Sequence, residues 1–318
     1  MARIRDPQQL VDALRAGDRS ALARALSLVE QGGQPARDVG RIAYPHGGHA
    51  YTVGLTGAPG AGKSTLTSAL IGNLRSRDER VAVLAIDPSS PFTGGAILGD
   101  RVRMQDHALD DGVFIRSMAT RGHLGGLALA TPQAIRVLDA AGAPWVLLET
   151  VGVGQVEVEV VGTADTTVVV VNPGWGDAVQ ANKAGLMEIA DVFVINKADR
   201  AGVSDTRRDL ETMLEMSELR SEDWRPPIVC TVAARSEGVE ELWEAILSHR
   251  EHLEATGGLA ERRSKRVLDE LRTIVARTLE ARAYELTTTD RFEALHQAVL
   301  DRALDPYAAA DEILGGLP

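Results

Sequence analysis

A nine-residue stretch, GAPGAGKST, has the residue types and spacing of a phosphate-binding loop. It matches the pattern G-x-x-x-x-G-K-[ST]. Glycines let the backbone curl so that its N–H groups point at phosphate oxygens, and the following helix N-terminus adds its dipole. The lysine of such a loop reaches the β- and γ-phosphates, and its serine ligates Mg²⁺. We predict that the whole stretch cradles the phosphates of a nucleotide: Gly57, Ala58, Pro59, Gly60, Ala61, Gly62, Lys63, Ser64 and Thr65.

A second motif, NKAD, predicts which base is bound. A carboxylate only accepts hydrogen bonds, so Asp199 can receive both N1–H and the exocyclic amino group of guanine. Adenine presents an acceptor at N1 and would leave that carboxylate without partners. Lys197 would lay its methylene stem along the purine, and Asn196 would brace the loop. A backbone N–H of Ala233 or Ala234 would reach guanine O6. The two motifs together predict GTP binding.

The stretch LLETVGVGQVEVEV delivers one carboxylate, Glu149, from a buried-looking apolar run into a glycine-rich turn. A glutamate arm can reach a metal-bound water or the γ-phosphate region from a more distant strand, and Gly152 could offer its N–H to the γ-phosphate. Mg²⁺ prefers oxygen ligands and is usually held by one or two carboxylates. The alternative for Glu149 is a strand-end charge that faces solvent. The residues expected around Mg²⁺ are Ser64, Asp87, Asp100 and Glu149.

Seven short apolar runs must position these residues. They are YTVGLTG, RVAVLAID, GVFIRSM, PWVLLET, TTVVVVN, DVFVINK and PIVCTVA, separated by segments of helical periodicity. Such continuous runs, rich in Val and Ile, are typical of strands covered by helices on both faces. We therefore expect an α/β fold with a doubly wound, mostly parallel sheet, which binds its ligand at the carboxyl ends of the strands.

Helical segments flank this region on both sides. We expect an N-terminal helical extension over 1–46, a nucleotide-binding domain over 47–256 and a C-terminal helical arm over 257–318. The segment QGGQPARDVGRIAYPHGGHA, rich in Gly and Pro, is interpreted as a linker. A later helix is expected to begin near Asp290. The arm carries an apolar stripe whose partner is either the sheet domain or a second subunit: Val267, Leu271, Ile274 and Val275.

Composition excludes several classes of protein. A net charge of −11 and a pI of about 5.2 argue against binding to nucleic acid. A single cysteine, Cys230, excludes internal disulfides and CxxC-based metal sites. No secretory signal or membrane-length apolar run is visible, so we expect a cytoplasmic protein without a membrane partner. The histidine pair His249 and His252 is expected on a helix surface and is not interpreted as a metal site.

With these motifs in place, the chain resembles the MeaB/ArgK family of P-loop GTPases. The resemblance rests on GLTGAPGAGKSTL, DPSSPFTGGAILGDRVRM, RSMATRGHLGGLA, ETVGVGQVEVEV and NKAD. It implies a GTP-hydrolysing chaperone of an adenosylcobalamin-dependent acyl-CoA mutase, mainly methylmalonyl-CoA mutase. Such a chaperone gates loading of intact cofactor and protects or reactivates the mutase. The resemblance also implies a homodimer joined through the C-terminal helical arm.

The family also implies roles for particular segments. By resemblance, 88–103 and 151–160 are nucleotide switches, and NPGWGDAVQANK is a third switch. Its Lys183 would become catalytic when the mutase docks; the alternative is a solvent-facing helix lysine. The expected catalytic residues are therefore Lys63, Glu149 and Lys183. Arg101, Arg103 and Arg121 are further candidates for a positive charge that the partner orders.

Two other functions remain open from the sequence. A metallochaperone GTPase that delivers nickel would need a Cys/His cluster, and none is visible. An ArgK-type kinase linked to amino-acid transport would need a pocket for an acceptor substrate, and the NKAD motif favours guanine over ATP. Nickel bound to the purified protein would support the first, and phosphotransfer to an acceptor the second.

Overall fold

The computed structural model describes residues 6–87, 107, 109–119, 124–150, 162–174, 189–216 and 223–315; of residues 87, 119 and 124–129 it describes the backbone alone. The chain divides into two compact units, Met1–Arg263 and Ser264–Pro318. No helix in the described ranges is long and apolar enough to cross a membrane.

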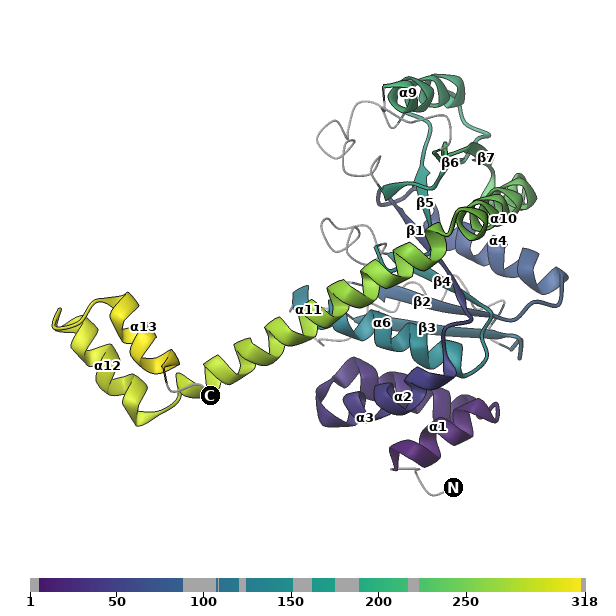
Figure 1. The fold of residues 1–318 in the computed structure, drawn as a ribbon. Helices are drawn as coiled ribbons and strands as arrows, with labels where there is room; N and C mark the ends of the chain where they lie inside the picture. Colours follow the sequence, from purple (N-terminus) through teal and green to yellow (C-terminus); the bar gives the residue numbers. More distant parts are fainter. Residues whose placement is uncertain are drawn as a thin grey trace. The chain divides into compact units, whose positions relative to one another are not determined.

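A seven-stranded parallel sheet is the centre of the first unit (Figure 1). Its strand order is β3-β2-β4-β1-β5-β6-β7. All seven apolar runs form strands, which confirms the predicted fold class. The strands are β1 (Tyr51–Gly57), β2 (Val81–Asp87), β3 (Val113–Ala119), β4 (Trp145–Thr150), β5 (Thr166–Val171), β6 (Val192–Asn196) and β7 (Ile228–Thr231).

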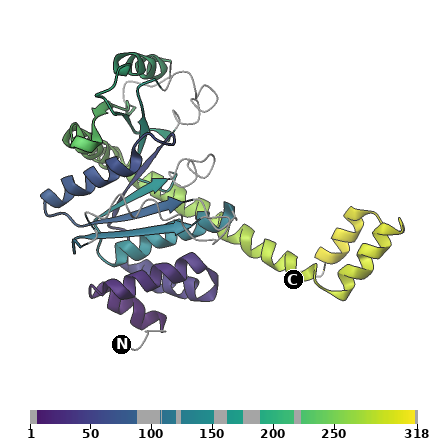
Figure 2. The ribbon, with the colours of Figure 1, turned by 180° about the vertical axis from the view of Figure 1, so that it is seen from behind.

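Helices cover both faces of the sheet. On one face α4 (Lys63–Ser76) and α10 (Val239–Thr256) enclose an apolar core with alternate strand residues. On the other face α6 (Leu124–Ala140) and the N-terminal helices α1 (Pro7–Arg15) and α2 (Arg19–Gln31) contribute to a second core. The view from behind shows the N-terminal helices next to α6 (Figure 2), and α2 packs against α6 directly. A third, smaller core lies beneath α9 (Val203–Glu215). Burial on both faces explains why the strand sequences are nearly continuously apolar.

The segment predicted to be a linker is mostly helical, and that prediction was wrong. It contains α3 (Gly33–Ala43) and the short 3₁₀ helix η1 (Tyr44–His46). Apolar side chains recur at helical spacing on the buried face of α3, at Ala36, Val39 and Ala43. Pro35 lies in the first turn, where its missing N–H costs no hydrogen bond. Gly32 and Gly33, with positive φ angles of 73° and 75°, form the tight turn at which α3 begins, and the segment is helical rather than a linker from there to His46.

His249 is fully buried, which corrects the prediction of a surface histidine pair. Its Nδ1 lies 2.8 Å from the hydroxyl of Thr166, and its Nε2 lies 3.2 Å from a carboxylate oxygen of Asp191. Thr166 opens β5 and Asp191 directly precedes β6, so α10 packs this side chain against the amino ends of two strands. Both ring nitrogens face polar atoms, and a buried histidine is tolerated under that condition.

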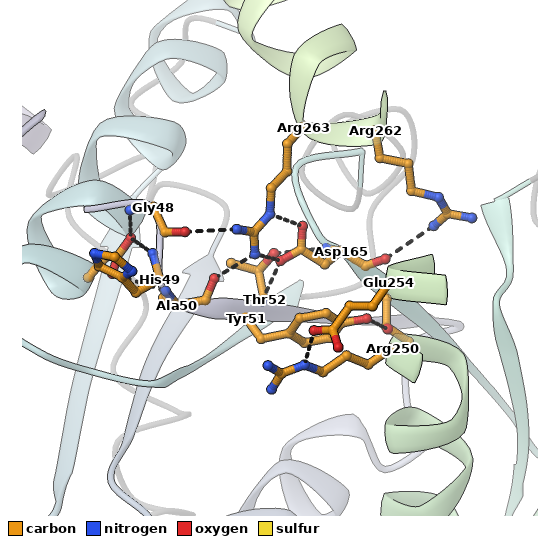
Figure 3. A network of polar contacts seen from close by, with 12 residues as sticks. Gly48, His49, Ala50, Tyr51, Thr52, Asp165, Arg250, Glu254, Arg262 and Arg263 are labelled. Atoms are coloured by element: carbon orange, nitrogen blue, oxygen red, sulfur yellow. Dashed lines mark hydrogen bonds and ion pairs between the residues drawn. The ribbon is translucent and has the colours of Figure 1, made fainter. Parts of the chain in front are cut away.

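Two arginines near the start of α11 (Gly258–Leu286) bind aspartates at that same edge of the sheet. Arg262 donates to both carboxylate oxygens of Asp191, at 2.8 and 2.9 Å. Arg263 donates to Asp165 at 2.8 Å and to the carbonyl oxygen of Ala50 at 2.8 Å (Figure 3). Bidentate arginine–carboxylate pairs have a fixed geometry and are stronger than hydrogen bonds between neutral groups. They fix the first turns of α11 to the amino ends of β5 and β6.

We predict that Arg262→Ala destabilises the first unit by about 1–3 kcal/mol at pH 7, because Asp191 is buried and would lose a charged partner. Burial alone would raise the pKa of Asp191, but the contacts with His249 and Arg262 outweigh it and hold that pKa below its usual value. A depressed carboxylate pKa stabilises the folded state above the unfolded pKa of about 3.9 and ceases to do so as pH falls through the folded-state value.

The difference in unfolding free energy between Arg262→Ala and the parent protein should therefore shrink as pH falls below about 4. Urea unfolding followed by tryptophan fluorescence measures it, because all four tryptophans belong to the first unit. Arg272→Ala is the matched control: its ion pair with Asp269 is exposed and should contribute at most about 0.5 kcal/mol. A loss for Arg262→Ala that does not depend on pH would contradict the assignment.

The second unit contains the rest of α11 and the helices α12 (Asp290–Leu300) and α13 (Pro306–Leu314). The N-cap of α12 is Thr289, whose side chain accepts from the N–H of Phe292, and the helix begins at the predicted position. No residue of α11 is buried. Its apolar stripe, including Leu271 and Val275, is exposed within the single chain.

Candidate functional site

The predicted phosphate loop connects β1 to α4. Three of its glycines, Gly57, Gly60 and Gly62, have positive φ angles of 135°, 76° and 94°. A Cβ atom on Gly57 would lie 2.0 Å from the carbonyl oxygen of Val170, and one on Gly62 would lie 2.4 Å from the side-chain nitrogen of Asn196. The backbone thus needs glycine at these two positions for both conformation and space.

Lys63 and Ser64 form the first turn of α4, and both are buried. The ammonium group of Lys63 donates to the carbonyl oxygen of Gly57 at 2.5 Å and to that of Ala58 at 3.2 Å. The lysine is therefore folded over the loop that it follows in sequence. A cation held across the mouth of a glycine-rich loop, beside a helix N-terminus, forms an environment that favours anionic phosphate groups.

Glu149 lies under the same helix turn. It is paired in the sheet with Leu55 of β1, whose side chain lies in the core beneath α4, so strand alternation directs the carboxylate to that face. The hydroxyl of Ser64 donates to Glu149. Glu149 is 1% exposed, so the alternative of a solvent-facing strand-end charge was wrong. A buried carboxylate next to a hydroxyl provides two hard oxygen donors of the kind that Mg²⁺ prefers.

The NKAD loop follows β6, at the same edge of the sheet. Asn196 is buried; its amide nitrogen donates to the carbonyl oxygen of Ala61 at 2.8 Å. Its side-chain oxygen accepts from the hydroxyl of Thr231 and from the N–H of Ala233, both at 3.1 Å. Asn196 therefore joins three segments, namely the phosphate loop, the NKAD loop and the turn after β7. The bracing role predicted for this residue agrees with these contacts.

Lys197 and Asp199 line the more exposed side of this junction. Lys197 adopts a positive φ of 59°, and its ammonium group donates to the carbonyl oxygen of Gly60 at 2.6 Å. The carboxylate of Asp199 is 42% exposed and lies 3.6 Å from the guanidinium group of Arg235. Its exposure leaves it accessible to a ligand, while the loop that carries it is fixed by Asn196 and by the Ala198 N–H bond to Thr231.

The turn after β7 forms the 3₁₀ helix η3 (Ala233–Arg235). The N–H of Ala233 is engaged by Asn196, whereas Ala234 is exposed. Sequence reasoning did not find the contact of Asn172, the first residue of the predicted third switch, whose amide donates to the carbonyl oxygen of Gly60 at 3.4 Å from the end of β5. It also did not find the contact of Arg235 with Asp199. No motif predicts either contact, and the strand order brings both residues to the loop.

Several predicted site residues lie outside the part of the chain that the structure describes. These are Asp100, Gly152 and Lys183, together with both predicted switches and residues 175–183 of the third switch. Asp87 ends β2, and its side chain is likewise outside the description. Within the described ranges no group of three or more His, Cys, Asp and Glu side chains is arranged to hold a metal ion.

Comparison with known proteins gives a consistent result. A protein of Pyrococcus abyssi is 52% identical over 314 residues, covering 97% of each chain. The GTPase ArgK of Escherichia coli is 38% identical over 81% of this chain and 80% of its own. The crystal structure of an LAO/AO transport system kinase superposes with a TM-score of 0.72 at 28% identity, covering 99% of this chain and 98% of that one.

The family model described as methylmalonyl Co-A mutase-associated GTPase MeaB matches residues 22–288. This range includes the whole sheet, the phosphate loop, the NKAD loop and all of α11. The predicted resemblance and the predicted GTPase activity are confirmed by this match and by the relatives named as GTPases. The chain belongs to the MeaB family of GTPases.

Proposed function

We propose that this protein is a guanine-nucleotide switch that acts as a chaperone of an adenosylcobalamin-dependent acyl-CoA mutase, with methylmalonyl-CoA mutase as the first candidate. The observation that carries the nucleotide part is the hydrogen bond between Asn196 and Ala61, which joins a base-reading loop to a phosphate loop at one edge of the sheet. The family description, which names a methylmalonyl-CoA mutase association, supports the partner.

In this proposal the nucleotide lies across the junction that Asn196 makes. Its phosphates contact the loop from Gly57 to Thr65, and its base meets Asp199, with the stem of Lys197 along one face. Ala234 is the better of the two candidate donors to guanine O6, because the N–H of Ala233 is already used by Asn196. Gly152 would add an N–H near the γ-phosphate.

The donors present fit Mg²⁺. Ser64 and Glu149 meet as a hydroxyl and a carboxylate beside the phosphate loop, buried to 6% and 1% exposure. Asp87, at the end of β2, and Asp100, in the first predicted switch, would complete the environment of the metal. When bound, Mg²⁺ would neutralise charge on the β- and γ-phosphates. Ser64 is the ligand expected in direct contact, and Glu149 the one that acts directly or through a water.

Hydrolysis then follows from what the residues of this chain can do. Lys63 would exchange its two carbonyl partners, Gly57 and Ala58, for phosphate oxygens and stabilise the charge that develops on the transferred group. A water attacks in line with the leaving oxygen. Lys183, in the third switch, would supply a second cation when the mutase docks. Slow turnover without the partner is the expected consequence.

The test is GTP hydrolysis by the purified protein, alone and with an adenosylcobalamin-dependent methylmalonyl-CoA mutase. We expect slow turnover that the mutase stimulates, and Lys183→Ala should abolish most of the stimulation while basal turnover persists. Arg200→Ala, on the loop after β6, is the matched control and should respond to the mutase like the parent protein. Turnover that is indifferent to the mutase would contradict the chaperone assignment and leave the GTPase intact.

The proposed assembly is a homodimer through the C-terminal arm. Six apolar side chains of α11 are between 39% and 57% exposed in the single chain: Val267, Leu268, Leu271, Ile274, Val275 and Leu279. A stripe of this kind on a long helix is stabilised by a partner surface. Symmetric pairing of two copies would bury the same stripe on each.

We predict that the double substitution Leu271→Asp, Val275→Asp converts the dimer to a monomer, because two desolvated charges per copy cannot be accommodated in an apolar interface. Sedimentation velocity measures the change in mass. Ala276→Asp, on a different side of the same helix, should leave the dimer intact. A parent protein that sediments as a monomer would contradict the proposed assembly.

A further inference from the structure

Asp199, the residue proposed to read guanine, has a charged neighbour that no motif predicts. Arg235 ends η3, and its Nη1 lies 3.6 Å from Oδ2 of Asp199. The side chains are 54% and 42% exposed, so both groups remain accessible to a ligand. A cation at this distance attracts the carboxylate without forming a close hydrogen bond with it. The arrangement biases where the carboxylate points.

A second carboxylate holds Arg235 in place. Its Nε donates to Oε1 of Glu237 at 2.7 Å, and its Nη2 donates to Oε2 at 3.2 Å. This is the two-pronged contact for which a guanidinium group is shaped. Glu237 binds the Nε and Nη2 edge of the guanidinium group, and the remaining nitrogen, Nη1, faces Asp199. Glu237 therefore keeps Arg235 close to Asp199 without allowing it to close on the base-reading carboxylate.

The turn that carries this pair is fixed by backbone contacts. Val232 and Glu237 form an isolated antiparallel bridge, with N–H to carbonyl distances of 3.0 and 3.4 Å. Ser236 takes a positive φ of 56° inside it. Gly238 follows with a φ of 73°, and a Cβ there would lie 2.1 Å from the carbonyl oxygen of Cys230. The turn is thus closed at its base and packed against β7.

The pair is also ionised at neutral pH. The hydrogen bond with Glu237, followed by its charge, raises the pKa of Arg235, with a smaller contribution from Asp199. The hydrogen bond with Arg235 lowers the pKa of Glu237. Arg235 and Glu237 therefore form a charged pair, and the guanidinium group lies closer to the carboxylate of Glu237 than to that of Asp199.

We propose that Arg235 is a positioning residue for base recognition, which orients Asp199 so that both of its oxygens meet guanine, and that Glu237 holds Arg235 back from competing for that carboxylate. The inference rests on the proposed role of Asp199 in reading guanine. A carboxylate has room for Arg235 and two base donors, because each oxygen accepts at two lone pairs. The orientation of both oxygens affects the affinity only for a base that presents two adjacent donors, N1–H and the exocyclic amino group, as guanine does.

Inosine diphosphate provides the discriminating probe, because hypoxanthine keeps N1–H and lacks the exocyclic amino group. Titration of nucleotide-free protein with GDP, IDP and ADP gives the affinity ratios. We expect Arg235→Ala to lower the GDP-to-IDP affinity ratio about fivefold, the effect of one exposed charge contact, with ADP unchanged. Glu237→Ala should weaken GDP and IDP alike, because Arg235 is released to pair with Asp199.

The double variant, Arg235→Ala with Glu237→Ala, should then bind both nucleotides as Arg235→Ala alone does. Arg200→Ala is the charge-matched control: it lies in the Asp199 loop, and its side chain makes no hydrogen bond or ion pair with another described residue. An unchanged GDP-to-IDP ratio in Arg235→Ala would overturn the inference. So would an equal loss for all three nucleotides, which would indicate a general effect on the loop.

Asp199→Asn separates this inference from the proposed function. If Asp199→Asn leaves the preference for GDP over ADP unchanged, the base is not read by Asp199 and both proposals fail together. If Asp199→Asn changes the base preference while Arg235→Ala leaves the GDP-to-IDP ratio as it was, the proposed function stands and the role of Arg235 alone is overturned.

Discussion

Replacing Asp199 with asparagine is expected to shift the base preference of this protein from guanine toward xanthine. An amide keeps one acceptor for N1–H, but its other atom becomes a donor that faces the exocyclic amino group of guanine. One charge-assisted hydrogen bond is lost and a donor–donor contact is created. We expect GDP affinity to fall by about 2–4 kcal/mol, which is about 30- to 1,000-fold. Xanthine carries a carbonyl at that position and can accept from the amide.

Titration of the Asp199→Asn variant with GDP, XDP and ADP measures this shift. The matched control is Asp205→Asn, which makes the same chemical change on the exposed first turn of α9, where Asp205 pairs with Arg208. It should leave all three affinities unchanged. GDP affinity that survives Asp199→Asn within about twofold would contradict the assignment of the NKAD loop to guanine recognition.

Glu149→Gln is expected to separate activity from stability. The glutamine keeps an acceptor for the hydroxyl of Ser64 but removes the charge that the proposed Mg²⁺ environment requires. We expect GTP hydrolysis at a fixed Mg²⁺ concentration to fall by about 10- to 100-fold. The free energy of unfolding should stay the same or rise, because a neutral amide is less costly to bury than a carboxylate at 1% exposure.

Hydrolysis across a series of Mg²⁺ concentrations, with urea unfolding of the same samples, tests both effects. Glu240→Gln is the control, since Glu240 also contacts α4, through Asn73 and Arg77, but at the opposite end of the helix from Ser64. Its turnover should match that of the parent protein. Unaltered turnover and Mg²⁺ dependence in Glu149→Gln would contradict a metal role for this residue.

The sheet was predictable because both of its faces are covered by helices, so the side chains on both sides of most strands are buried. Most strands are therefore nearly continuous apolar runs rich in Val and Ile, as in TTVVVVN and DVFVINK. The phosphate loop and the NKAD loop were predictable for a different reason. Each is a contiguous motif, and the carboxyl ends of parallel strands bring both to one edge.

Features that depend on tertiary contacts were missed. α3 has glycine, proline and charged residues at its exposed positions, and only the neighbouring α2 and α6 show that its buried face is apolar. His249 has the sequence environment of a surface residue, yet Thr166 and Asp191 lie more than fifty residues away in the chain and provide its partners. The Arg262–Asp191 and Arg235–Asp199 contacts have no motif for the same reason.

For Glu149, the sequence predicted a position near the ligand but not the face of the sheet on which its side chain lies. A carboxylate at the end of an apolar run predicted a residue near the ligand, and the register with Leu55 brings it beneath Ser64. What the run could not decide was the face to which the carboxylate points. That depends on which strand lies next to β4, and the insertion of β4 between β2 and β1 is a property of the whole sheet.

The most direct test of the central claim, that this edge of the sheet binds and hydrolyses guanine nucleotides, is a comparison of GTP and ATP as substrates of the wild-type protein. Release of phosphate is measured across a range of each nucleotide with Mg²⁺ present. We expect a kcat/KM for GTP at least about 100-fold above that for ATP, since the carboxylate of Asp199 accepts from N1–H and the exocyclic amino group of guanine, whereas adenine presents an acceptor at N1 and a C–H beside it. Equal values for the two nucleotides would contradict it.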